Sequence, residues 1–139
     1  MTLNDLVTRV RSYTRDTTGT LFDLSDITSF INEGIDKLKQ IKALENMSSL
    51  EENEQSVDLL PPQYHYCLAV YGASRCFSQD EQHYLAQTFA EEFNGLYDLI
   101  ELGIKEGTIV ITDKSGNVVN DTNDLDGVTD VYFRKYYGN

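Results

Sequence analysis

Two histidines and two cysteines, residue types that bind zinc, lie close together in the middle of the chain: His65, Cys67, Cys76 and His83. On a helix, His65 and Cys67 would point about 200° apart, and Cys67 and Cys76 about 180° apart. His65 and Cys76 would share a face but lie about 16 Å apart, against zinc bond lengths of about 2.0–2.3 Å. If the segment is helical, the four side chains cannot share an ion, and we expect no metal and no cofactor.

The helix that would separate these ligands is predicted from the double proline at 61–62 to about Phe77. Proline is well tolerated in the first turn of a helix, where its missing N–H has no partner in any case. Small side chains then recur at helical spacing and form a strip on which another helix can pack closely. The strip consists of Ala69, Gly72, Ala73 and Cys76. A helix apolar on most sides is either central to its bundle or covered by a partner chain.

Three further helices are predicted from apolar periodicity, over residues 2–14, 25–41 and 78–103. Their expected N-terminal caps are Thr2 with Asp5, Ser25, and Ser78 with Glu81. Residues 47–60 change period and predict a short β-hairpin around an acidic turn. We therefore expect a mainly α fold, a small bundle of about four helices with a short β-hairpin, over residues 1–107.

The segment after Gly107 has a different character. "TIVIT" predicts a strand, "DKSGN" a turn, and "NDTNDLDG" a polar loop before an aromatic-rich end. Residues 108–139 are thus expected to form an extended C-terminal arm or a small β extension. The acidic loop is no EF-hand, because alignment on Gly127 leaves Thr122 and Phe133 at positions that need acidic ligands.

Acidic residues outnumber basic ones by 23 to 11, which gives a formal net charge of −12. Such a surface repels nucleic acid and anionic lipid. No apolar run approaches the roughly 20 residues of a membrane span, and the first residues do not resemble a signal peptide. With 139 residues, enough for one compact domain, we expect a soluble, non-secreted protein without a membrane partner.

Catalytic chemistry has no support in the sequence. The acids of the predicted fourth helix fall on its polar side, which is typical of a solvated face. The chain also lacks a glycine-rich phosphate loop and a recognisable nucleophile motif. We expect a protein that is not an enzyme and that has no catalytic residues.

Four aromatic residues crowd into the last eight positions: Tyr132, Phe133, Tyr136 and Tyr137. Chain ends are normally disordered unless they dock on something. One interpretation is a last strand folded back on its own domain. The other is an arm that adds to a neighbouring subunit, where tyrosines are favoured anchors.

Four segments, taken in order, resemble the head-to-tail connector (adaptor, neck) proteins of tailed bacteriophages. They are "MTLNDLVTRVRSYTRDT", "FDLSDITSFINEGIDKLKQ", "SVDLLPPQYHYCLAVYGASRCF" and "AEEFNGLYDLIELG". In that family an acidic or polar hairpin leads to "LP..Y" before a helix rich in small residues. The resemblance is one of order and spacing and covers about residues 1–107. Gly34 departs from it, since alanine is usual there, and the segment after Gly107 matches no motif.

The resemblance implies a virion structural protein of the neck, between capsid and tail, assembled in the host cytoplasm. Its implied partners are the portal protein, a stopper or tail-completion protein, and further copies of itself in a dodecameric ring. DNA would pass through this ring without specific binding, which an acidic wall favours. We therefore predict Glu51, Glu52 and Glu54 as channel-wall candidates and the four terminal aromatics as a portal or subunit contact. The alternative from another class is an acidic monomeric regulator or inhibitor that binds a host protein.

Overall fold

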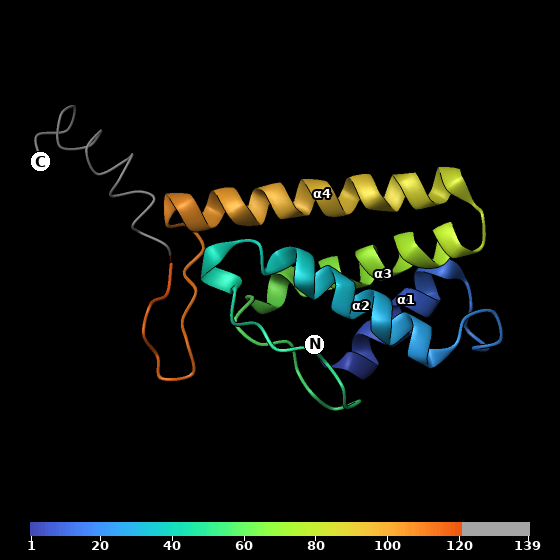
Figure 1. Ribbon diagram of the computed structural model, residues 1–139, viewed down its shortest axis with the longest axis horizontal. Helices are drawn as coiled ribbons and strands as arrows, with labels where there is room; N and C mark the ends of the chain where they lie inside the picture. Colours follow the sequence, from blue (N-terminus) through green and yellow to red (C-terminus); the bar gives the residue numbers. More distant parts are fainter. Residues whose placement is uncertain (121–139) are drawn as a thin grey trace, which may run out of the picture.

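The computed structural model describes residues 1–120, which form four α-helices and two short 3-10 helices (Figure 1). The elements are α1 (Leu3–Thr14), α2 (Leu24–Leu38), η1 (Lys42–Leu44), η2 (Pro62–Tyr64), α3 (Tyr66–Gln79) and α4 (His83–Glu106). The predicted mainly helical class and the number of helices are confirmed. In the part of the chain that the structure describes, no helix combines the length and apolarity that crossing a bilayer requires.

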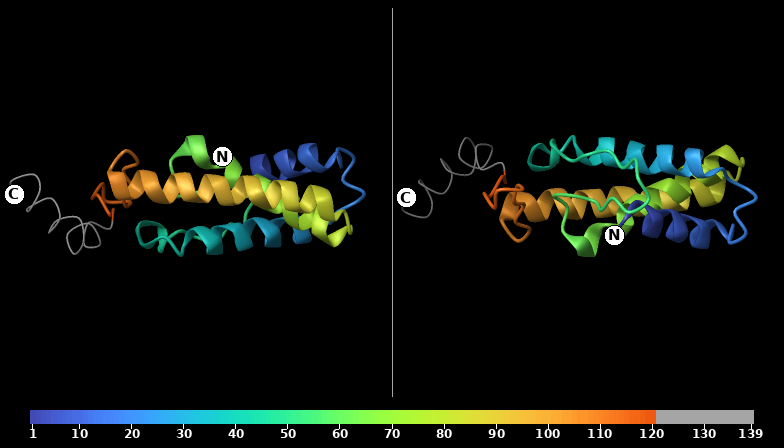
Figure 2. Two further views of the ribbon diagram at one scale, coloured as in Figure 1. Left: turned by 90° about the horizontal axis from the view of Figure 1, so that it is seen from above. Right: turned by 90° about the horizontal axis from the view of Figure 1, so that it is seen from below.

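Helix α3 lies at the centre of the bundle and packs against each of the other three α-helices. Helix α4 runs along α3, and α1 and α2 flank this pair on opposite sides (Figure 2). The bundle itself therefore covers the largely apolar surface of α3.

The predicted capping box of α1 is present. The Asp5 N–H donates to Thr2 Oγ1 over 3.1 Å, and the Thr2 N–H donates to Asp5 Oδ2 over 3.0 Å. These two bonds satisfy N–H groups that a helix start leaves without an internal partner. The helix then buries an apolar stripe against the core: Leu3, Leu6, Val7 and Val10.

The predicted caps of the second and fourth helices are wrong. Ser25 lies inside the first turn of α2, which begins at Leu24. Ser78 belongs to α3, because that helix continues to Gln79. The Gln82 N–H closes the following turn by donating to the Phe77 carbonyl over 2.9 Å. Helix α4 then extends beyond Gly103 to Glu106, since burial of Ile104 continues its apolar face for another turn.

The predicted β-hairpin over residues 47–60 is wrong, and residues 1–120 contain no strand. The Asn32 side chain takes the place of a partner strand for Leu50. Its Oδ1 accepts from the Leu50 N–H over 2.8 Å, and its Nδ2 donates to the Leu50 carbonyl over 2.9 Å.

The same segment also serves the start of α1. The Leu3 N–H donates to the Gln55 carbonyl and the Asn4 N–H to the Asn53 carbonyl, both over 2.9 Å. These N–H groups belong to the first turn of α1 and need acceptors from outside the helix. The carbonyls of Asn53 and Gln55 therefore bond to a helix end and do not pair with the other half of a hairpin.

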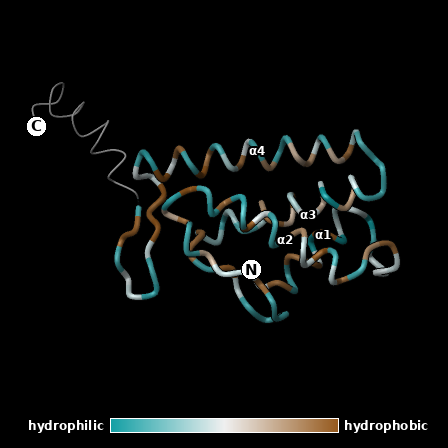
Figure 3. The backbone as a smooth tube through the Cα atoms, in the orientation of Figure 1, coloured by the Kyte–Doolittle hydropathy of each residue, from teal (hydrophilic) through white to brown (hydrophobic). Residues whose placement is uncertain are grey.

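Residues 108–120 fold back beside the C-terminal end of α4, where Ile109 and Ile111 are buried. Their hydrophobic start follows directly on α4 in Figure 3. The predicted strand is reduced to an isolated bridge between Thr112 and Val118. The predicted turn is present, because Asp113 Oδ1 accepts the N–H groups of residues 115 and 117, each over 2.9 Å.

Candidate interaction surfaces

The four sequence candidates for a metal site occupy separate places. His65 is buried between η2 and α3, both cysteines are buried and free within α3, and His83 is exposed at the start of α4. Among residues 1–120, no three His, Cys, Asp or Glu side chains are grouped so that they could hold an ion. Burial raises the pKa of Cys67 and of Cys76 to about 12, so both thiols stay protonated at neutral pH.

His65 instead joins the segment before α3 to the beginning of the chain. Its Nε2 lies 2.6 Å from the Leu60 carbonyl oxygen, and its Nδ1 lies 2.7 Å from the Met1 amino nitrogen. A neutral ring satisfies both contacts when Nε2–H donates to Leu60 and Nδ1 accepts from Met1. Burial lowers the pKa of His65, the hydrogen bond to Leu60 opposes this, and the Met1 charge lowers the pKa further. This structural role was missed in the sequence, where the histidine drew attention only as a ligand.

The small residues of α3 lie in the core. Ala69, Ala73 and Cys76 are fully buried. A Cβ atom on Gly72 would lie 3.0 Å from Val10 Cγ2 and 3.5 Å from Ile31 Cγ1. Gly72 therefore marks the place where α1 and α2 both approach α3.

Gly34 of α2 provides a second close approach to α3. A Cβ atom there would lie 3.2 Å from Leu68 Cδ2 and 3.2 Å from Tyr71 Cδ1. These distances are tighter than ordinary side-chain contacts, so an alanine would require its neighbours to shift. Glycine at position 34, where the connector pattern has alanine, therefore has a packing reason.

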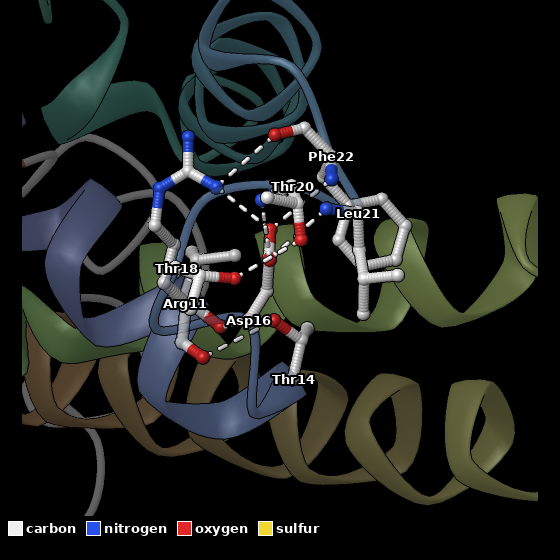
Figure 4. A network of polar contacts seen from close by, with 8 residues as sticks. Arg11, Thr14, Asp16, Thr18, Thr20, Leu21 and Phe22 are labelled. Atoms are coloured by element: carbon white, nitrogen blue, oxygen red, sulfur yellow. Dashed lines mark hydrogen bonds and ion pairs between the residues drawn. The ribbon is translucent and has the colours of Figure 1, made fainter.

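Among residues 1–120, Asp16 is the side chain with the most hydrogen bonds, and it organises the α1–α2 loop (Figure 4). Its Oδ1 accepts the N–H groups of Thr20 and Leu21 over 2.9 and 3.0 Å. Its Oδ2 accepts the Phe22 N–H over 3.1 Å and pairs with Arg11 Nη1 over 2.7 Å. Burial raises the pKa of Asp16, but the three backbone donors and the Arg11 charge outweigh it, so the pKa lies below its ordinary value.

The Asp16 network fixes the loop that leads into α2. Arg11 Nη1 also donates to the Phe22 carbonyl over 3.1 Å, which closes a ring of contacts between the end of α1 and the end of the loop. The Asp16 side chain is fully buried, so its charge is compensated by these partners and not by water. The sequence signal was an aspartate directly after a helix, which can accept N–H groups of the following loop.

The three acidic channel-wall candidates, Glu51, Glu52 and Glu54, are all exposed on the turn beside the start of α1. The Gln55 side chain braces this turn. Its Oε1 accepts the Glu51 N–H over 2.8 Å, and its Nε2 donates to the Ser49 carbonyl over 2.7 Å. None of the three carboxylates pairs with a cation of residues 1–120.

Large apolar side chains are exposed near both ends of the bundle. At the end that holds the α1–α2 loop and the α3–α4 turn, which we call the loop end, they are Leu21, Leu24 and Tyr84. Toward the C-terminal end of α4, which we call the tail end, they are Leu99, Leu102, Val110 and Val118. The predicted contact residues Tyr132, Phe133, Tyr136 and Tyr137 lie outside the described residues.

Comparisons of this chain with protein families, with curated proteins and with solved structures give no match. The functional assignment therefore rests on the residues and on their geometry.

Proposed function

We propose that this protein is a head-to-tail adaptor of a tailed-bacteriophage virion, assembled as a ring beneath the portal protein. The observation that carries the proposal is the ordered series of segments that resembles this family. It runs from a capped first helix through "SDITSFIN" and the acidic turn to "LLPPQY" and a helix rich in small residues. In the fold, "LLPPQY" leads through η2 into the central helix α3.

The surface supports a role that depends on protein contacts. Cys67 and Cys76 are buried with raised pKa values, and the two histidines lie apart from them, so these four residues are ill suited to nucleophilic or metal chemistry. Apolar side chains are exposed at both the loop end and the tail end. A ring requires two different surfaces on each subunit, because each copy contacts one neighbour on either side.

The braced turn with Glu51, Glu52 and Glu54 is our candidate for the wall of the DNA channel. Three exposed carboxylates without cationic partners among residues 1–120 present uncompensated negative charge to solvent. A wall of this kind repels the phosphate backbone and favours passage over binding. The stopper or tail-completion protein would then dock on the face of the ring away from the portal.

The test is binding of the purified chain to capsids of the same phage that contain the portal protein but lack the neck proteins. We expect saturable binding, with a ring of copies visible under the portal by electron microscopy. Solution mass alone does not decide, because subunits can remain monomeric until the portal templates the ring. If the chain does not bind the portal protein but binds a purified host protein, the adaptor proposal is refuted and the acidic regulator is favoured.

A further inference from the structure

The lysines of the described chain gather at one end of the molecule. They are Lys37 and Lys39 at the end of α2, Lys42 in η1, Lys105 in the last turn of α4 and Lys114 in the segment after it. These elements lie together at the tail end, whereas the arginines of residues 1–120 belong to α1, its C-cap and α3 (Figure 1). Lysine in the last turn of a helix stabilises the helix dipole, which accounts for part of this placement. It does not account for charges that find no acidic partner within residues 1–120.

A small hollow lies among these lysines, between η1 and the end of α4. Its volume is about 220 Å³, below the roughly 300–1,000 Å³ of typical small-molecule sites. Ile41, Ala43 and Ile104 line it and are buried, while Lys42 and Lys105 line it and are exposed. Glu101 is the acidic residue among its lining, so the charge there is net positive in a protein of net charge −12. An apolar floor with a basic rim suits one apolar side chain flanked by acids.

The chain itself carries such a sequence immediately after the described residues. The Asn120 side chain donates to the Ile104 carbonyl over 3.1 Å and to the Ile109 carbonyl over 2.8 Å, which fixes the start of this segment beside the hollow. The residues that follow read "DTNDLDG", in which Leu125 stands between Asp124 and Asp126. An extended chain spans at most about 3.3–3.6 Å per residue, so Leu125 can be up to about 17 Å from Asn120. That reach covers a hollow whose lining residue Ile104 is already bonded to Asn120.

We propose that residues 121–126 occupy this hollow in their own chain, with Leu125 on the apolar floor and Asp124 and Asp126 beside Lys42 and Lys105. Charge complementarity and the fixed position of Asn120 both favour the same chain as the occupant. Exposed ion pairs are individually weak and are screened by salt, so the contact is a releasable latch on the start of the C-terminal segment. The inference needs no phage function, because it depends only on groups within one chain.

The test is zero-length carbodiimide cross-linking of the full chain at low salt, which joins a lysine amine to a carboxylate it touches. An equal mixture of 14N- and 15N-labelled protein distinguishes links within one chain from links between two copies. We expect Lys42 or Lys105 to link to Asp121, Asp124 or Asp126 in peptide pairs that carry the same nitrogen label, which marks links within one chain. We expect the yield of these links to fall severalfold at high salt. Links found mainly in mixed pairs would place a second copy in the hollow and overturn the proposal.

A second measurement covers the case in which the cross-link geometry is unfavourable. Amide NMR signals of Ala43 and Ile104 should shift in Asp124→Asn/Asp126→Asn and in Leu125→Ser. The matched control is Asp23→Asn at the exposed start of α2, which should leave both signals in place. No cross-link to residues 121–126 together with unshifted signals in both variants overturns the proposal. Because neither assay contains portal protein, these outcomes leave the adaptor function to its own test.

Discussion

Replacement of Asp16 by asparagine tests whether one buried carboxylate holds the α1–α2 loop in place. Asparagine is nearly isosteric, and its carbonyl oxygen can keep the Thr20 and Leu21 N–H groups that Oδ1 accepts. Its amide nitrogen then faces the Phe22 N–H and the Arg11 guanidinium, two donors that lose their acceptor. The substitution therefore changes about half of the network without creating a cavity.

The expected cost follows from these two losses. A buried donor left without a partner costs about 1–3 kcal/mol, and breaking a fully buried ion pair costs about 3–5 kcal/mol. Arg11 retains 18% side-chain exposure, so water recovers part of its interaction. We expect the free energy of unfolding to fall by about 3 kcal/mol, a large share of the roughly 5–15 kcal/mol available to a domain.

Urea unfolding followed by far-ultraviolet circular dichroism measures this loss. The matched control is Asp23→Asn, because Asp23 is exposed and its side chain makes no capping bond to α2. We expect the control to stay within about 0.5 kcal/mol of the wild type. If the two variants lose equal stability, or if Asp16→Asn loses less than the control margin, the buried network does not stabilise the fold as argued.

The acid dependence gives an independent check on Asp16. Its folded pKa lies below the ordinary value, so the unfolded chain binds a proton more readily than the folded one. The contribution of Asp16 is fully present above the unfolded pKa of about 3.9 and is lost as the pH falls through the folded pKa. We expect the stability difference between wild type and Asp16→Asn to shrink on acidification below about pH 4.

Four further predictions concern other parts of the molecule. The lowered pKa of His65 means that its neutral form stabilises the fold, so stability should fall as the pH drops below about 6.5. One titrating proton changes the free energy of unfolding by at most about 1.4 kcal/mol per pH unit. His65→Gln should remove this pH dependence, and the control His83→Gln, at an exposed site, should retain it. Gly72→Ala should lower the free energy of unfolding by about 1 kcal/mol, because overpacking against Val10 outweighs the gain in helix propensity. Gly95→Ala has open space around the new Cβ atom and should raise the free energy of unfolding by up to about 1 kcal/mol. Thermal unfolding measures both changes. Lysine at positions 51, 52 and 54 should slow DNA ejection from reconstituted particles while leaving thermal stability unchanged, and normal ejection would count against the channel-wall role. Deletion of residues 128–139 should weaken assembly onto portal particles, and unchanged assembly would refute the predicted aromatic contact.

Local patterns predicted much of the helical architecture. The capping box of Thr2 and Asp5 needs only residues three apart, and the buried side chains of α2 follow its apolar period in the sequence. Helix starts were harder to predict. Ser25 was the expected N-cap of the second helix, but α2 begins one residue earlier, at Leu24, because neighbouring residues can each begin a helix. The end of α4 depended on Ile104, whose burial the bundle decides.

The segment over residues 47–60 shows where local reasoning fails. Its composition suits extended backbone, and the backbone is indeed largely non-helical, but a strand needs a partner. Asn32 lies 18 positions from Leu50 and competes for its hydrogen bonds through a side chain. Nothing in the local sequence distinguishes this partner from the other half of a hairpin.

The candidate sites divide in the same way. Helical geometry alone separated His65, Cys67 and Cys76, since side-chain directions follow from spacing once the helix is granted. The sequence also determined the acidic charge, the strip of small residues and the order of helices, because these are properties of composition and local periodicity. Only the tertiary structure placed Gly34 and Gly72 at close helix contacts, since helix crossings depend on how distant surfaces fit. It also joined His65 to Met1 and set the hollow at the tail end beside Asn120, because hydrogen bonds and pockets between distant segments exist only after the chain has folded.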